Sequence, residues 1–116
     1  MDISVLIGQT ITEVTSSNTE ITFKTSEGNE YLMYHDQDCC ETVTIDDING
    51  DLQRLIGQPI SIAEERISSG LEDDYAESST WTFYSIANIN EFVTIRWYGT
   101  SNGYYSEGVS FKKINN

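Results

Sequence analysis

Basic side chains, histidine, cysteine and proline are all scarce in this sequence. Six Lys and Arg, one His, two Cys and one Pro occur among 116 residues. The longest apolar stretches, such as residues 4–7 and 92–95, fall far short of the roughly 20 residues that a membrane-spanning helix needs. The first residues also lack the basic start and cleavage site of a secretory signal. We therefore expect a protein of the cytoplasm of whatever cell makes it, with reduced thiols.

Acidic side chains, in contrast, dominate the charge. Nineteen Asp and Glu give a net charge of −13, which repels phosphate backbones and anionic lipid. This charge argues against direct nucleic-acid binding and against membrane binding. It favours a protein partner with a basic surface, as nucleic-acid-handling proteins have. The alternative is that the charge only keeps the protein soluble.

Length and patterning predict one α+β domain, residues 1–116. Seven Tyr, four Phe and two Trp supply enough core-forming side chains for a folded chain. The pattern is mainly antiparallel β, with about eight strands in two meanders and one or two short helices. Strands are expected at 10–15, 19–25, 30–35, 42–45, 60–67, 80–88, 92–98 and 104–114. Helices are expected at 2–7 and from 46 or 47 to about 56, each followed by a glycine.

One short repeat is visible. The sequence LIGQTI at 6–11 matches LIGQPI at 55–60, an offset of 49 residues. Two copies are too few for a solenoid. The repeat instead predicts a compact fold with pseudo-symmetric halves.

The densest set of metal-binding residue types is YHDQDCCE at 34–41, which contains the sole His and both Cys. His35, Asp38, Cys39 and Cys40 are candidate ligands of a structural zinc ion. Glu64, Glu65 or Glu107 are possible replacements for one of these ligands. Adjacent cysteines do not match a standard zinc motif, and a vicinal disulfide would need an unusual ring. The alternative is that the cysteines are small core residues and His35 is a hydrogen-bonded residue at the rim.

Aromatic residues gather near the C-terminus. Trp81 and Phe83 are expected in the core. Tyr104 and Tyr105 follow a turn and must face opposite ways in a strand, so one of them is a candidate interface anchor.

The YHDQDCCE string, with residues 47–52, 55–60 and 63–65, resembles a family of small phage and prophage proteins described as a domain of unknown function. Residues 80–84 and 95–107, the latter with the sequence IRWYGTSNGYYSE, look like that family's closing motifs. The resemblance covers nearly the whole chain. Small acidic phage products are similar in size and charge to anti-CRISPR proteins, some of which block type II RNA-guided nucleases by occupying basic surfaces meant for nucleic acid.

These features predict a phage-encoded anti-CRISPR inhibitor that binds a type II Cas nuclease and prevents target DNA from loading. No enzyme active site is recognisable. The predicted contact acids are Asp46, Asp47, Asp51, Glu72, Asp73 and Asp74. The alternatives are a small metal-dependent enzyme or ligand-binding protein using His35, Cys39, Cys40, Glu65 and Glu107, and an inhibitor of another host DNA-handling enzyme.

Overall fold

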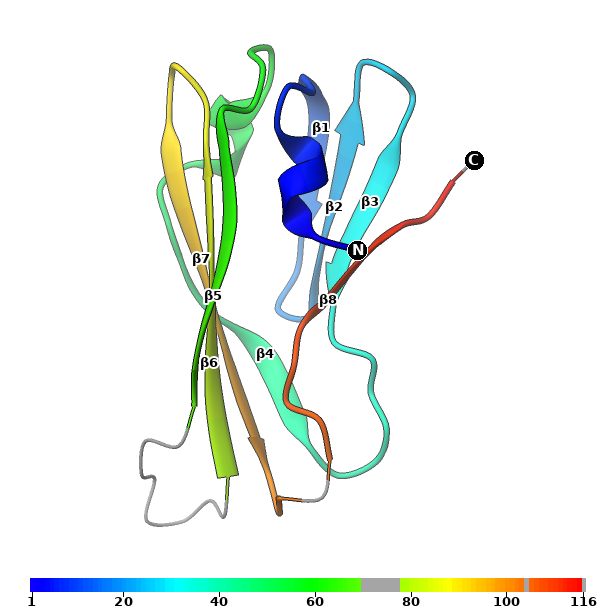
Figure 1. The fold of residues 1–116 in the computed structure, drawn as a ribbon, viewed down its shortest axis with the longest axis vertical. Coiled ribbons are helices and arrows are strands. Elements are labelled where there is room, and N and C mark those ends of the chain that lie inside the picture. The colour runs from blue at the N-terminus through cyan, green and yellow to red at the C-terminus, as the bar shows by residue number, and fades with distance from the viewer. Residues whose placement is uncertain (70–77, 104, 116) are drawn as a thin grey trace.

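The computed structural model describes residues 1–69, 78–103 and 105–115, which form two antiparallel sheets facing each other (Figure 1). The α+β prediction is wrong. Both helical segments in this described part of the chain are single 3₁₀ turns, η1 (Ile3–Leu6) and η2 (Leu52–Leu55). The helix expected from residue 46 or 47 does not form, because Ile45 and Ile48 pack against the core from a strand that bulges at Asp46.

Eight strands are present in the described residues, as the sequence predicted. They are β1 (Ile11–Ser16), β2 (Glu20–Thr25), β3 (Glu30–Tyr34), β4 (Thr42–Asn49), β5 (Ile62–Ser69), β6 (Ser78–Ala87), β7 (Phe92–Ser101) and β8 (Ser110–Lys113). The sheet orders are β1-β2-β3-β8 and β4-β7-β6-β5. The second meander is therefore β5-β6-β7, and the final strand pairs with β3 rather than continuing that meander as expected.

The two halves of the chain repeat one topology. Each half contains a 3₁₀ turn, a three-stranded meander and a fourth strand that crosses to the other sheet: β4 joins β7, and β8 joins β3. The 3₁₀ turns also pack against the other half, since η1 contacts β5 and η2 contacts β1. This arrangement agrees with the pseudo-symmetry that the repeat predicted.

The two repeated segments, residues 6–11 and 55–60 (the LIGQ segments), form hydrogen bonds with each other directly. The Gly8 N–H donates to the Ile60 carbonyl at 2.8 Å, and the Gly57 N–H donates to the Ile11 carbonyl at 3.0 Å. These two hydrogen bonds are related by the 49-residue offset. Both glycines have positive φ, +86° and +97°, which glycine adopts without steric cost as the chain leaves each 3₁₀ turn.

The hydrophobic core lies between the sheets and draws side chains from both. Its largest members are Trp97 and Tyr84, each 1% exposed. The Trp97 N–H donates to the Met33 sulfur at 3.4 Å across the two sheets. The prediction that Trp81 and Phe83 belong to this core is wrong. In β6 the even-numbered Thr82, Tyr84 and Ile86 are buried, so alternation turns the odd-numbered neighbours outward.

Within the described residues, no helix is long and apolar enough to cross a membrane.

Candidate binding end of the sandwich

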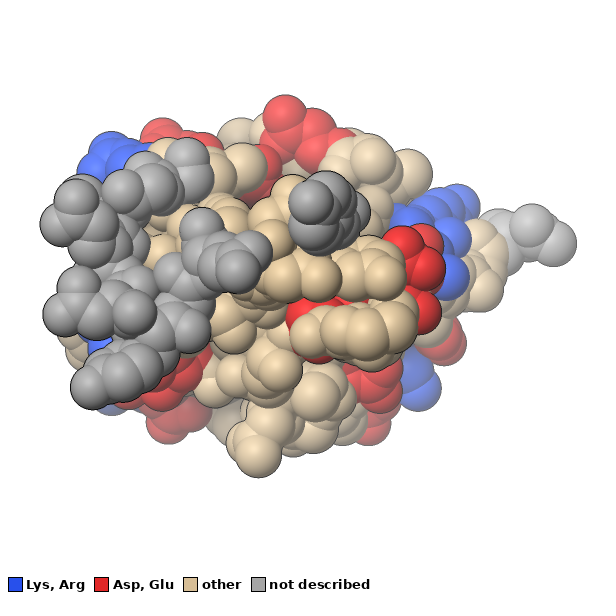
Figure 2. All heavy atoms as spheres, turned by 90° about the horizontal axis from the view of Figure 1, so that it is seen from below, with Lys and Arg blue, Asp and Glu red and all other residues tan. Residues whose placement is uncertain are grey.

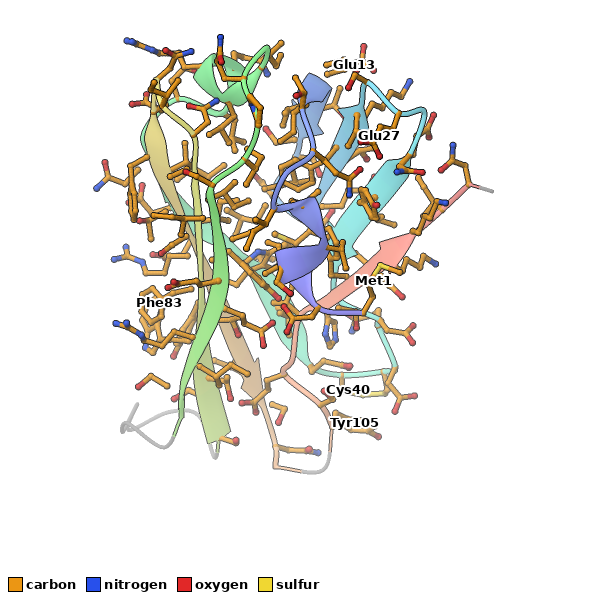
Figure 3. All side chains as sticks on the ribbon, turned by 45° about the horizontal axis from the view of Figure 1, so that its top comes forward. Met1, Glu13, Glu27, Cys40, Phe83 and Tyr105 are labelled. Atoms are coloured by element: carbon orange, nitrogen blue, oxygen red, sulfur yellow. A yellow bond between two sulfur atoms is a disulfide. The ribbon has the colours of Figure 1, made fainter. Side chains whose placement is uncertain are left out.

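Two connections between the sheets meet at one end of the molecule. Residues 35–41 lead from β3 to β4, and residues 102–109 lead from β7 to β8. Figure 3 shows Cys40 and Tyr105, one from each connection, at the end opposite to Glu13 and Glu27. We call residues 35–41 and 102–109, excluding the undescribed residue 104, the crossover end.

A buried carboxylate organises the first connection. The side chain of Glu41 is fully buried. One of its oxygens accepts from the Asp38 N–H at 3.0 Å and from the His35 ring at 2.9 Å. The other accepts from the Cys39 N–H at 2.9 Å and from Gln37 Nε2 at 3.1 Å. One side chain thus fixes the path of the loop that precedes it.

These contacts control the pKa of Glu41. Burial alone would raise it. The N–H groups of Cys39, Asp38 and Glu41 itself, together with the His35 ring, outweigh burial and lower the pKa to about 2. The carboxylate therefore stays charged over the whole physiological pH range.

His35 ties the two connections together. Its Nε2 contacts Glu41, and its Nδ1 lies 2.7 Å from the Gly108 carbonyl oxygen. Both partners are acceptors, so both hydrogen bonds form together only when each ring nitrogen carries a proton. Gly108 was expected within a strand. It instead precedes β8 and serves as the contact point for His35.

The second connection contains a buried carboxylate of its own. Glu107 is 7% exposed and accepts from the hydroxyls of Thr80 at 2.7 Å and Ser101 at 2.5 Å. Burial by itself would raise the pKa of Glu107, but the hydroxyls of Ser101, Thr80 and Ser78 lower it. Glu41 and Glu107 thus stand before β4 and β8, at corresponding places in the two halves.

Gly99 makes room for Glu107. A Cβ at this position would lie 2.9 Å from both the Cβ and the carbonyl oxygen of Glu107, and 3.0 Å from Val43 Cγ2. We expect Gly99→Ala to lower the free energy of unfolding by about 1–3 kcal/mol, because this overpacking pushes on backbone atoms. Denaturant unfolding measures the loss, with Thr100→Ala, next on the strand and facing outward, as the control. Equal stabilities for the two variants would contradict the packing of Glu107 on Gly99.

The outer surface of the crossover end is polar and acidic. Asp36 and Asp38 are exposed, and neither forms an ion pair with another described residue. A pocket of about 480 Å³ lies between the two connections. It is lined by His35, Asp36, Gln37, Asp38, Ser106, Gly108, Val109 and Ser110. Figure 2, viewed onto this end, shows a largely uncharged centre with Asp and Glu atoms, and some Lys and Arg atoms, around it.

The predicted zinc ligands lie close together in sequence, but Cys39, Cys40 and His35 are already bonded to other groups. Cys39 and Cys40 form a disulfide, which the sequence argument had disfavoured. Both nitrogens of His35 are hydrogen-bonded, and the Asp38 side chain faces solvent. No group of three or more His, Cys, Asp or Glu side chains in the described residues is placed to hold a metal ion. Zinc binding stays a prediction that requires reduction of the disulfide and a new position for His35.

The alternative ligands lie in separate places. Glu65 accepts from the Tyr84 hydroxyl at 2.6 Å, and Glu64 lines a depression on the outer face of the second sheet. Burial, followed by the hydrogen bond to Glu65, raises the pKa of Tyr84. Glu107 is enclosed by hydroxyl groups. The structure therefore does not bring the residues of the proposed metal-dependent enzyme into one described cluster.

The predicted contact acids do not form one patch either. Asp46 pairs with Arg96 at 2.5 Å, and Asp47 is exposed beside it on β4. Asp51 lies at the end of the molecule opposite to the crossover end, where its side chain caps η2 by accepting from the Gln53 N–H at 2.9 Å. Residues 72–74, with Glu72, Asp73 and Asp74, fall outside the described part of the chain, as does Tyr104. Tyr105 is half-buried at the crossover end.

Fold and site together define a β-sandwich of two intertwined halves whose crossing connections form a shaped, acidic end. The chain belongs to the family described as Domain of unknown function (DUF7448), whose model matches residues 4–111. No curated protein matches the chain. No solved structure matches it either.

Proposed function

We propose that this protein is a phage-encoded, stoichiometric inhibitor that uses its crossover end to bind a basic surface of a nucleic-acid-handling protein. A type II Cas nuclease is the specific partner proposed. The observation that carries this proposal is the loop at 35–41. Its own polar groups fix its shape around Glu41, while Asp36 and Asp38 are left exposed without a cation.

Such a loop suits binding better than catalysis. The groups capable of acid–base chemistry, His35 and Glu41, are saturated by internal hydrogen bonds. A loop that is already ordered loses little conformational entropy on binding, so more of the contact energy appears as affinity. The crossover end therefore presents acids in a preset geometry.

Charge supports the choice of partner. The net charge of −13 speeds encounter with a basic surface and opposes encounter with nucleic acid. In a type II Cas nuclease the guide–target heteroduplex lies in a positively charged channel. An acidic protein seated there excludes target DNA. The resemblance to small phage proteins suggests the same host-directed role.

Asp46, Asp47 and Asp51 remain predicted contacts. They lie away from the crossover end, with Asp46 and Asp47 next to each other on β4 and Asp51 before η2, so they would meet other parts of a partner than the crossover end does.

The test is inhibition of DNA cleavage by a guide-loaded type II Cas nuclease. We expect wild-type protein to inhibit near equimolar ratio, and D36K/D38K to need at least about tenfold more protein, because two attractive charges become repulsive. The matched control is E13K/E27K, which makes the same charge change at the far end (Figure 3). Glu13 loses only an exposed ion pair with Lys24 there.

Three results decide the outcome. Loss of inhibition by D36K/D38K but not by E13K/E27K supports the crossover end. Equal weakening of inhibition by both variants means that only net charge matters, and this contradicts a specific role for the crossover end. No inhibition and no complex with wild-type protein overturns the Cas assignment.

A further inference from the structure

The outer faces of the two sheets differ sharply, although pseudo-symmetry makes them equivalent. The β1-β2-β3-β8 face carries more charged side chains: Lys24 pairs there with Glu13 at 3.1 Å and lies 3.9 Å from Glu30, and Lys112 Nζ lies 4.8 Å from the ring centre of Tyr34. The β4-β7-β6-β5 face carries more aromatic side chains. These are Trp81, Phe83, Tyr98 and Phe92, the last 54% exposed. We call this second surface the aromatic face.

Neighbouring contacts hold the aromatic face in shape. The Trp81 ring lies 4.3 Å from the Tyr98 ring and 6.5 Å from Phe83, centroid to centroid. The Arg96 guanidinium stands 5.2 Å above the Trp81 ring and is fixed by Asp46. All three rings remain partly exposed. An ordered apolar surface of this kind favours association with another protein surface.

Two unpaired charges of opposite sign flank this surface. Strand register places Asp47, Arg96, Phe83 and Arg66 in one row across β4, β7, β6 and β5. Asp47 and Arg66 are exposed at the two ends of the row, and neither makes an ion pair with another described residue. Three strand spacings separate them, about 14 Å.

We propose that the aromatic face binds a second copy of this chain, face to face, about a two-fold axis parallel to the strands. That axis exchanges the two edges of the sheet, so Asp47 lies opposite the partner subunit's Arg66, and Arg66 opposite the partner's Asp47. The next row brings Tyr98 against the partner's Trp81. A two-fold axis that lies in the plane of the interface but runs perpendicular to the strands would instead place Asp47 opposite the partner's Asp47. Charge complementarity therefore selects the parallel axis.

Net charge gives this dimer a distinctive salt dependence. Each copy carries −13, and this repulsion acts over a Debye length of about 30 Å at 0.01 M salt but about 8 Å at 0.15 M. We expect dimerisation to tighten between these two concentrations, because the long-range repulsion is screened while the apolar contact is not.

The geometry of this dimer also has a consequence for binding to a partner, and this consequence rests on the proposed function. A two-fold axis parallel to the strands leaves the crossover ends of both copies on the same side of the dimer. The dimer then offers two acidic ends to one extended basic surface, which raises apparent affinity through the second contact.

Sedimentation of the full chain at about 0.15 M salt tests the dimer without any nuclease, so its result is independent of the Cas assignment. We expect D47R and R66D each to weaken dimerisation at least tenfold, since each brings like charges together. The double variant D47R/R66D keeps the wild-type net charge and should restore dimerisation. E20R and K113D, exposed charges elsewhere, are the matched controls and should leave it unchanged.

Acrylamide quenching of tryptophan fluorescence locates the interface. Trp97 is buried at 1% exposure, so quenching reports mainly on Trp81 and should increase when the protein is diluted below its dimerisation range. A monomer at concentrations up to about 1 mM overturns the proposal. So does a dimer in which Trp81 stays quenchable, or one that the charge swap fails to restore.

Discussion

Replacing Trp97 with alanine is expected to lower the free energy of unfolding by roughly 3–5 kcal/mol. The indole is 1% exposed and packs between the sheets. Its N–H donates to Met33 on the opposite sheet. Truncation removes a large buried apolar surface and leaves a cavity that two hydrogen-bonded sheets cannot fill. Denaturant unfolding with linear extrapolation measures the loss.

Trp81 supplies the control of the same residue type. Its ring lies on the aromatic face and is partly exposed, so Trp81→Ala should cost distinctly less, about 1 kcal/mol. Both variants are compared at a concentration where the wild-type protein is monomeric. A larger loss for Trp81→Ala than for Trp97→Ala would contradict the assignment of inner and outer faces.

Replacing Glu41 with alanine is expected to lower the melting temperature by roughly 10 °C or more and to release the loop at 35–41. The substitution leaves the N–H groups of Asp38 and Cys39 and the ring of His35 without their acceptor. Leaving buried or partly buried donors without an acceptor is costly, and in a domain of this size each kcal/mol moves the melting temperature by several degrees. Asp38→Ala, in the same loop but exposed, is the control and should change the melting temperature little.

The same carboxylate gives stability a defined pH dependence. The folded pKa of Glu41, about 2, lies below its ordinary value of 4.5, so the unfolded chain binds the proton more tightly. The stabilisation is complete above pH 4.5 and is lost as pH falls towards 2. Glu107, whose pKa is also lowered, acts in the same direction. Glu41→Gln should flatten this part of the stability profile, and an unchanged acid slope would contradict the role of Glu41.

Local pattern predicted the strands because alternation and turn residues are local signals. The number of strands was correct, and most boundaries lie within a few residues of the observed ones. The partner of β8 was not predictable in this way, because pairing with β3 joins residues far apart in sequence. The helix expected from residue 46 or 47 to about 56 did not form, because tertiary packing of Ile48 outweighed a capping signal.

The importance of residues 34–41 was visible in the sequence, but the chemistry that organises them was not. Composition drew attention to His35 and the two cysteines as metal ligands. The organising residue is Glu41, whose main partners are backbone N–H groups. Such contacts cannot be predicted from residue types, because nearly every residue carries a backbone N–H. The reciprocal binding of the LIGQ segments and the outward position of Trp81 also depend on which strands meet.

Hydrogen exchange of the protein in complex with a guide-loaded type II Cas nuclease tests the central claim most directly. We predict slower exchange at residues 35–41 and 105–109 on binding, with β2 and the turn at 26–29 unchanged. A complex that leaves the crossover end unprotected while protecting another surface, or the absence of any complex, would contradict the account.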